Sequence, residues 1–142
     1  MAIATDLQDR QVDAGGLRTR YWEVGEGPPV VLLHGIGAHA GFWRAAIPGL
    51  AEHYRLLIPD MCGFGRSQRP PVVSRTAFGD WLAGFIQALD VAPCAAVGNS
   101  MGGGVVLAAA LDHPECLDRI VLSDSISLGR NVMFMMRLLT IP

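Results

Sequence analysis

Short apolar runs, separated by glycine-rich turns and by longer amphipathic segments, make up most of the chain. Residues 30–33 and 94–97 are apolar at every position, which is typical of strands buried on both faces of a parallel sheet. Residues 54–58 and 117–123 have the pattern of two further strands. Such strands, alternating with helical segments, predict an α/β domain in which helices cover both faces of the sheet.

The N-terminal part of the chain shows a different pattern, in which apolar and polar residues alternate. The alternation runs through residues 11–14 and 17–24, on either side of Gly15 and Gly16. A period of two is that of a β-strand, and a pair of glycines between two such runs is a turn signal. We therefore expect a β-hairpin with one face exposed to water.

The segments between the strands have apolar residues at helical spacing. We expect helices over residues 42–53, 75–89 and 103–111, and a further amphipathic helix over residues 131–139. The large apolar residues of the segment 75–89 repeat along one helical face, so we expect them in the core rather than at a cofactor. These residues are Phe78, Trp81, Leu82, Phe85, Ile86 and Leu89.

Composition narrows the class of protein. The chain has 142 residues, of which 51% are hydrophobic and 17% charged, and this length allows one domain with a core. No uninterrupted apolar run approaches the roughly 20 residues of a membrane-spanning helix. The net charge is −2 and the basic residues are scattered, which argues against nucleic acid and anionic membranes as partners. The first residues lack the layout of a secretion signal, so we expect a cytoplasmic protein.

The three cysteines, Cys62, Cys94 and Cys116, are far apart in the sequence. Their spacing matches neither a disulfide framework nor a zinc site. We expect three reduced, buried thiols, and we expect no metal and no other cofactor.

The pentapeptide Gly98-Asn99-Ser100-Met101-Gly102 lies between a predicted strand and a predicted helix. G-x-S-x-G in this context is the nucleophile-elbow pattern, in which a serine is exposed on a strained turn and glycines remove the Cβ atoms that would collide. The helix that follows directs free N–H groups and the positive end of its dipole toward the space above the hydroxyl. A glycine-rich turn with a bystander serine is the simpler interpretation of the pentapeptide alone.

Three motifs occur in a fixed order, each after a predicted strand: His34-Gly35-Ile36-Gly37, the glycine-rich loop of residues 60–67, and the pentapeptide around Ser100. In this the sequence resembles the α/β-hydrolase superfamily over nearly its whole length. The sequence motifs at residues 59–67 and 98–103 are most similar to those of hydrolases that cleave carbon–carbon bonds in products of aromatic-ring meta-cleavage. The corresponding motifs of lactonases and small carboxylesterases are nearly as similar. The resemblance implies a doubly wound, mostly parallel sheet that is incomplete at its C-terminal side.

The resemblance also implies roles for individual residues. Ser100 would be the nucleophile, and the backbone N–H groups of Ile36 and Met101 would form the oxyanion hole, leaving the Ile36 side chain free to line the pocket. The substrate would be a small molecule with a reactive carbonyl: an ester, a lactone or a vinylogous carbon–carbon bond. Serine at the elbow disfavours the aspartate-nucleophile variants of the superfamily. Self-association of the full-length protein is left open.

A serine nucleophile needs a histidine base and an acid, which in this superfamily follow the serine along the chain. The only histidine after Ser100 is His113, at the far end of the helix that begins at the elbow, roughly 20 Å away at about 1.5 Å per residue. We expect packing and loop hydrogen bonds for His34, a place near the site mouth for His39 and a surface position for His53. The catalytic histidine is therefore not identified in this sequence.

Two aspartates are candidates for other roles. Asp60 closes a predicted strand, and we expect it to cap its own glycine-rich loop. Asp124 follows the strand next to the elbow, where some superfamily members carry the triad acid, although a turn-forming role is the default. We expect residues 1–128 to be the N-terminal part of a hydrolase core and residues 129–142 the start of a lid. These 142 residues alone would then be poorly soluble and inactive.

Two functions from other classes compete with the hydrolase. Gly35, Gly37 and Ala40 follow a strand, and the next strand ends in Asp60, a pattern close to that of a dinucleotide-binding Rossmann domain. Pro48 interrupts the helix that such a domain needs. The other alternative is a non-catalytic, hydrolase-like module that has kept its fold for binding.

Overall fold

A computed structural model describes residues 7–126, so the predicted helix over residues 131–139 and the predicted lid segment lie outside the described residues. A six-stranded sheet with the order β1-β2-β4-β3-β5-β6 runs through this part of the chain. β3 pairs in parallel with β4 and β5, and β5 pairs in parallel with β6, whereas β2 pairs antiparallel with both β1 and β4. The strands are β1 (Arg10–Ala14), β2 (Leu17–Val24), β3 (Pro29–Leu33), β4 (Arg55–Pro59), β5 (Cys94–Asn99) and β6 (Leu117–Ser123).

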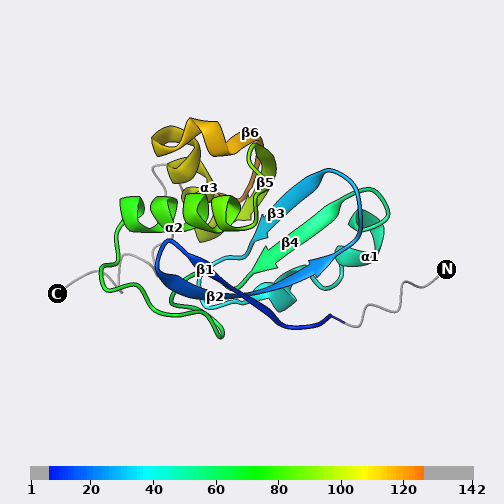
Figure 1. The fold of residues 1–142 in the computed structure, drawn as a ribbon, viewed down its shortest axis with the longest axis horizontal. Helices are drawn as coiled ribbons and strands as arrows, with labels where there is room; N and C mark the ends of the chain where they lie inside the picture. The colour runs from blue at the N-terminus through cyan, green and yellow to red at the C-terminus, as the bar shows by residue number, and fades with distance from the viewer. Residues whose placement is uncertain (1–6, 127–142) are drawn as a thin grey trace.

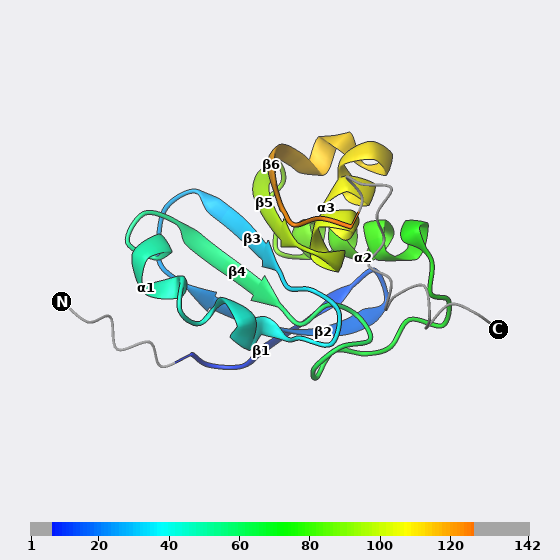
Figure 2. The same cartoon turned by 180° about the vertical axis from the view of Figure 1, so that it is seen from behind.

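Helices cover the two faces of this sheet. The helices α2 (Arg75–Ala88) and α3 (Met101–Asp112) lie side by side on one face, whereas α1 (Ile47–Leu50) lies on the opposite face, beside β4 (Figures 1 and 2). The mostly parallel, doubly wound sheet predicted from the sequence is therefore confirmed. Within residues 7–126 no helix is long and apolar enough to cross a membrane.

The two faces of the sheet bury separate apolar clusters. The larger cluster lies under α2 and α3, where Trp81, Leu82, Phe85 and Ile86 are almost completely buried, as their helical spacing predicted. The smaller cluster lies on the other face and includes Trp22 and Ile47, with side chains of β3 and β4. Because the central strands contribute side chains to both clusters, apolar residues at every position of these strands are explained.

The predicted helix over residues 42–53 is wrong in its extent. The structure has a short 3-10 helix, η1 (Ala40–Trp43), followed by the single-turn helix α1 (Ile47–Leu50), with Pro48 in the first turn of α1. Proline has no N–H to donate and is tolerated only in the first turn of a helix, so a helix that already spanned residues 42–46 could not continue through it. The chain instead restarts its helix at Ile47.

The hairpin of β1 and β2 forms as predicted, but the expected water-exposed face is wrong for β2. Thr19 and Arg20 are buried, with exposed fractions of 0% and 6%. The Thr19 hydroxyl accepts a hydrogen bond from Nε1 of Trp81 at 2.8 Å, and the Arg20 guanidinium pairs with Asp60. Alternation in the sequence shows which residues are polar, but a polar residue with buried partners can face the interior.

The cysteines match the prediction made from their spacing. Cys62, Cys94 and Cys116 are free and buried. Burial raises the pKa of the Cys62 and Cys94 thiols to about 12. At neutral pH both thiols are therefore protonated and behave as small apolar side chains.

Candidate active site

Ser100 stands at the turn between β5 and α3 with backbone angles of φ 52° and ψ −115°. A positive φ is uncommon for a residue that carries a Cβ, and it persists only where the surroundings enforce it. The turn projects the serine from the carboxyl end of β5 onto the N-terminus of α3. This is the strained geometry expected of a nucleophile elbow.

The glycines around Ser100 are required by close approaches of the backbone. A Cβ at position 98 would collide with the carbonyl group of Gly102, and a Cβ at position 102 would lie 2.7 Å from the carbonyl oxygen of Leu33. Both contacts are with backbone atoms, which cannot rotate away as a side chain could. The G-x-S-x-G pattern is therefore explained by steric exclusion on both sides of the serine.

The end of β6 and the residues that follow it hold the elbow in place. The Ser100 N–H donates to the carbonyl of Ser123 at 2.9 Å, and the Ile126 N–H donates to the carbonyl of Ser100 at 3.3 Å. The Ser100 carbonyl also accepts from Gly103 at 3.1 Å, which begins the hydrogen bonding of α3. Both backbone polar groups of Ser100 are thus used in hydrogen bonds.

The loop that runs from the end of β3 to the first residue of η1, residues 34–40, lies against the elbow at Gly35. A Cβ at position 35 would lie 3.2 Å from the Cβ of Ser100. The hydrogen bonds among the described residues leave the N–H groups of Ile36 and Met101 without an acceptor. Met101 is the first residue of α3, where N–H groups have no partner within the helix. The Ile36 side chain is 56% exposed and can line a pocket.

His34 is a buried residue with both ring nitrogens engaged. Its Nε2 accepts from the Met61 N–H at 3.0 Å, so its Nδ1 carries the proton that is donated to the Gly35 carbonyl at 2.7 Å. Burial lowers the pKa of His34, which keeps the ring neutral. The predicted structural role of His34 is confirmed, and neither nitrogen can take a proton from Ser100.

His113 and His53 lie at the positions expected from the sequence, whereas the expected place of His39 near the site mouth stays a prediction. His113 follows the last residue of α3, and its Nε2 lies 2.7 Å from Oδ1 of Asp80 on α2. His39 uses Nδ1 to cap η1 by accepting from the Gly41 N–H at 3.0 Å. His53 is exposed. Within residues 7–126 no histidine is hydrogen-bonded to the Ser100 hydroxyl.

Asp60 is buried and caps its glycine-rich loop, as expected, through a hydrogen bond from the Arg66 N–H to Oδ2 at 3.0 Å. It also binds Ala40 and Arg20, contacts that the sequence did not predict. The carboxylate is 2% exposed and already accepts hydrogen bonds from three residues, so it is not accessible to a ribose. The loop after β3 also leads into a 3-10 turn rather than a long helix. The dinucleotide-binding alternative is therefore wrong.

Asp124 lies directly after β6, one residue beyond the Ser123 carbonyl that binds the elbow. Its φ is 45°, and its side chain is exposed. No hydrogen bond or ion pair joins its carboxylate to another residue of the described chain. The structure thus brings Asp124 near the elbow without linking it to a histidine, and its role as the triad acid stays a prediction.

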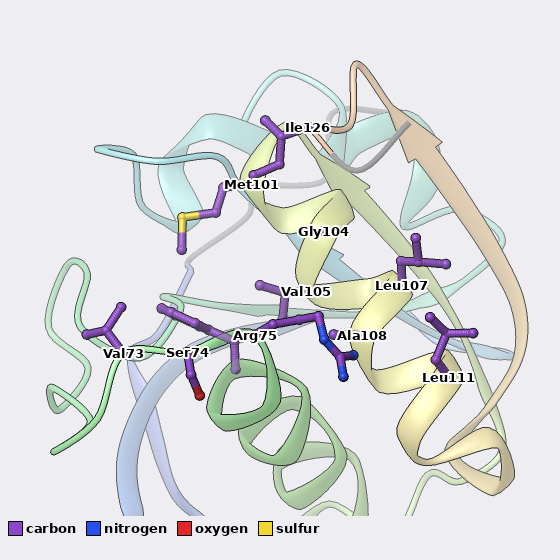
Figure 3. Close-up of a pocket in the computed structure, with 11 residues that line it drawn as sticks. Val73, Ser74, Arg75, Met101, Gly104, Val105, Leu107, Ala108, Leu111 and Ile126 are labelled. Atoms are coloured by element: carbon purple, nitrogen blue, oxygen red, sulfur yellow. The ribbon is translucent and has the colours of Figure 1, made fainter. Parts of the chain in front are cut away.

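An apolar groove of about 410 Å³ lies beside the elbow, between the start of α2 and the outer face of α3 (Figure 3). Met101 and Ile126 line its end next to the elbow, and Leu111 lines the other end. Sequence analysis missed this groove. Its one sequence signal is the helical spacing of Gly104, Leu107 and Leu111, an apolar face of α3 that α2 does not cover.

Comparison with known proteins identifies relatives of this chain. The family model described as alpha/beta hydrolase fold matches residues 28–139. A 2-hydroxy-6-oxo-6-(2'-aminophenyl)hexa-2,4-dienoic acid hydrolase of Metapseudomonas resinovorans is 42% identical over 125 residues, which are 84% of this chain and 43% of that protein. A 2-hydroxymuconate semialdehyde hydrolase of Pseudomonas sp. (strain CF600) is 40% identical over 121 residues, covering 82% of this chain and 43% of the relative.

The solved structures agree with the sequence comparison. A serine-to-alanine mutant of the meta-cleavage product hydrolase CumD from Pseudomonas fluorescens IP01, complexed with acetates, has a TM-score of 0.78 and 40% sequence identity. This match covers 84% of the present chain and 45% of the CumD chain. The chain thus spans less than half the length of these relatives.

Proposed function

This chain belongs to the α/β-hydrolase family, and on that premise we propose that Ser100 is the nucleophile of a serine hydrolase that attacks the carbonyl group of a small molecule. The observation that carries the proposal is the elbow itself. Ser100 is held at a positive φ at the start of α3, and two backbone N–H groups without acceptors among the described residues, those of Ile36 and Met101, lie on the elements that meet there. Such strain without a structural need is characteristic of functional sites.

The proposed chemistry begins with attack of the Ser100 hydroxyl oxygen on the substrate carbonyl carbon. A bond forms between these atoms, the carbonyl π electrons move to oxygen, and the hydroxyl proton passes to a general base. The N–H groups of Ile36 and Met101 then donate to the oxyanion, an interaction that is worth about 3 kcal/mol per donor in comparable enzymes. Collapse of the oxyanion expels the leaving group, which takes the proton, and water releases the acyl group from the serine.

The general base of this mechanism is not found among the hydrogen-bond partners of Ser100 within residues 7–126. His34 and His113 already have other hydrogen-bond partners, and the Ser100 hydroxyl has no histidine partner within residues 7–126. We propose that the base belongs to a part of the natural protein other than these 142 residues, consistent with the 43% of the relatives' length that the chain covers. In this proposal residues 1–128 form part of the hydrolase core and residues 129–142 begin the lid.

Asp124 is our candidate for the acid that orients the base. It follows β6, the strand whose Ser123 carbonyl binds the elbow, and its carboxylate is free of partners among the described residues. A carboxylate that orients a histidine must be accessible to it, and Asp124 meets that condition. Asp124→Asn should then lower kcat without changing the labelling site.

We propose that the substrate is a 2-hydroxy-6-oxo-dienoate whose carbon–carbon bond is cleaved next to the oxo group, with simple esters and lactones as the alternative. The names of the relatives support the first choice, since they act on compounds of this class. The apolar groove end at Met101 and Ile126, next to the elbow, suits the apolar part of such a substrate. Both classes require carbonyl attack by the same serine, so the elbow alone does not separate them.

The test uses the protein that carries this sequence at its natural length. A fluorophosphonate should label Ser100, located by peptide mass spectrometry, and Ser100→Ala should abolish labelling and hydrolysis. Ser123→Ala is the matched control, because it keeps the carbonyl that binds the elbow and should leave labelling unchanged. Loss of dienoate absorbance and release of p-nitrophenol from an activated ester then separate the two substrate classes. Absence of labelling would favour the non-catalytic binding module instead.

A further inference from the structure

We propose that Asp60 is a positioning residue for the oxyanion hole, because it fixes the end of the loop that carries the Ile36 N–H. The inference rests on the proposed function and concerns a residue that would not touch the substrate. The loop in question comprises residues 34–40, from the end of β3 to the first residue of η1, and is called the oxyanion loop below. Asp60 and Met61, two consecutive residues after β4, bind its two ends.

The first end of the oxyanion loop is held at His34, whose Nε2 accepts from the Met61 N–H at 3.0 Å. The second end is held at Ala40, whose N–H donates to Oδ1 of Asp60 at 2.7 Å. Ile36 lies between these two anchor points, with no hydrogen bond of its own to another described residue. The position of the Ile36 N–H relative to Ser100 therefore depends on the two anchors.

The carboxylate of Asp60 has little freedom to move. Its side chain is buried, Oδ2 accepts from the Arg66 N–H at 3.0 Å, and Oδ1 accepts from Arg20 at 3.3 Å as well as from Ala40. A Cβ at position 65 would lie 3.0 Å from the Cβ of Asp60 and closer still to its carboxyl group, so the neighbouring backbone packs directly on this side chain. Asp60 thus ties the oxyanion loop to the glycine-rich loop that follows β4.

Arg20 forms an ion pair with this anchor. Its guanidinium is buried between Asp60 and Asp9 and lies 4.4 Å from the centre of the Trp22 ring. An ionised acceptor forms stronger hydrogen bonds with N–H donors than a neutral one does. β2, expected to expose its polar residues, thus buries an arginine that pairs with the same carboxylate that binds the Ala40 N–H.

The consequence concerns catalysis more than stability. Donors of an oxyanion hole act because they are already in place when the charge develops. A shift of about 1 Å in such a group can lower a rate on the order of a hundredfold. Loosening the Ala40 end of the loop should therefore slow the chemical step and leave substrate binding almost unchanged.

The decisive variant is Asp60→Asn in the natural-length protein. The amide has one acceptor oxygen, so it can bind Ala40 or Arg66 but not both, because its NH₂ group would face the other N–H. We expect kcat to fall about 10- to 100-fold. This loss is no larger than the roughly 100-fold or greater loss that follows removal of an oxyanion donor. KM should change by less than about threefold. Hydrogen exchange of the peptide covering residues 36–40 should become at least about tenfold faster, since its anchoring hydrogen bond is weakened.

Asp9→Asn is the matched control, because Asp9 binds the other side of the same arginine and has no hydrogen bond or ion pair to the oxyanion loop. It should leave kcat and the exchange of residues 36–40 as in the wild type. The proposal is overturned if folded Asp60→Asn shows wild-type exchange, or if the Ala40 amide of the wild type already exchanges like an unprotected one. Unchanged kcat in Asp60→Asn, together with loss of activity in Ser100→Ala, would refute the positioning role while leaving the hydrolase proposal intact.

Discussion

Gly102 packs directly against His34. A Cβ at position 102 would collide with the His34 carbonyl oxygen and would lie 2.7 Å from the carbonyl of Leu33. The first turn of α3 and the start of the oxyanion loop are thus in backbone contact, with no side chain between them. This contact joins the two elements that carry the proposed oxyanion donors, the N–H groups of Met101 and Ile36.

Gly102→Ala should destabilise the protein, and Gly104→Ala should not. Both substitutions add the same methyl group to α3, where alanine is favoured over glycine by about 1 kcal/mol. At position 102 the methyl group meets rigid backbone, and overpacking of this kind costs about 1–3 kcal/mol. At position 104 the nearest atom is 3.5 Å away, in the side chain of Ile126. Urea denaturation of both variants measures the difference, and equal stability would contradict the steric explanation.

The order of elements and the elbow could be predicted from the sequence because their signals are local. The central strands are apolar at every position, and Ser100 is bracketed by glycines at the spacing that the turn requires. The contacts of Asp60 with Ala40 and Arg20 could not be predicted, since they join residues 20 and 40 positions apart. The local sequence around a carboxylate at the end of a strand is the same whether its hydrogen-bond partners are local or distant.

The stability of the protein should depend on pH through His34. Burial lowers the pKa of His34 below its ordinary value of 6.5, more strongly than the Gly35 carbonyl and the Asp60 carboxylate raise it. Above pH 6.5 the ring is neutral in both the folded and the unfolded state, so this residue adds no pH dependence. Below that pH the unfolded state binds the proton first, and the free energy of unfolding falls by up to about 1.4 kcal/mol per pH unit until the lower folded pKa is reached.

The pH effect is measured by urea denaturation of the natural-length protein between pH 7.5 and pH 5. His34→Gln should be less stable at pH 7.5 but should lose less stability than the wild type on acidification. His53→Gln is the control, because His53 is exposed and its replacement should leave the slope unchanged. Parallel slopes for the wild type and His34→Gln would show that His34 is not a buried neutral residue.

Thr19→Val should destabilise the domain although it replaces a polar side chain by an apolar one of similar shape. The Thr19 hydroxyl accepts from Nε1 of Trp81 at 2.8 Å, and both side chains are buried. Valine leaves the indole N–H without an acceptor, which costs about 1–3 kcal/mol. Thr19→Ser keeps the acceptor and should recover most of the loss, as judged by thermal denaturation. A valine variant as stable as the serine variant would mean that this hydrogen bond contributes nothing.

The burial of Thr19 also shows where sequence patterns stop being informative. The alternation along β2 predicts the strand and its hairpin partner, and both predictions are confirmed. The pattern places Thr19 and Arg20 on opposite faces and predicts that one face is wet. Both residues are instead buried. Thr19 is bound by Trp81 of α2, and Arg20 is paired with Asp9 and Asp60. None of these partners is adjacent to Thr19 or Arg20 in the sequence.

The 142 residues expressed alone should be poorly soluble and should not hydrolyse an activated ester. Within the described residues, Leu111, Val121 and Ile126 expose 68%, 57% and 42% of their surface, all on or beside α3 and β6. Among residues 7–126, β6 is the last strand of the sheet and presents an unpaired edge, a feature that promotes association between chains. Turnover should also be absent, because the Ser100 hydroxyl has no histidine partner in this part of the chain. Size-exclusion chromatography and a p-nitrophenyl ester assay, run beside the natural-length protein, test both parts. A monodisperse monomer that hydrolyses the ester, with activity lost in Ser100→Ala, would refute the prediction and place the general base within these residues.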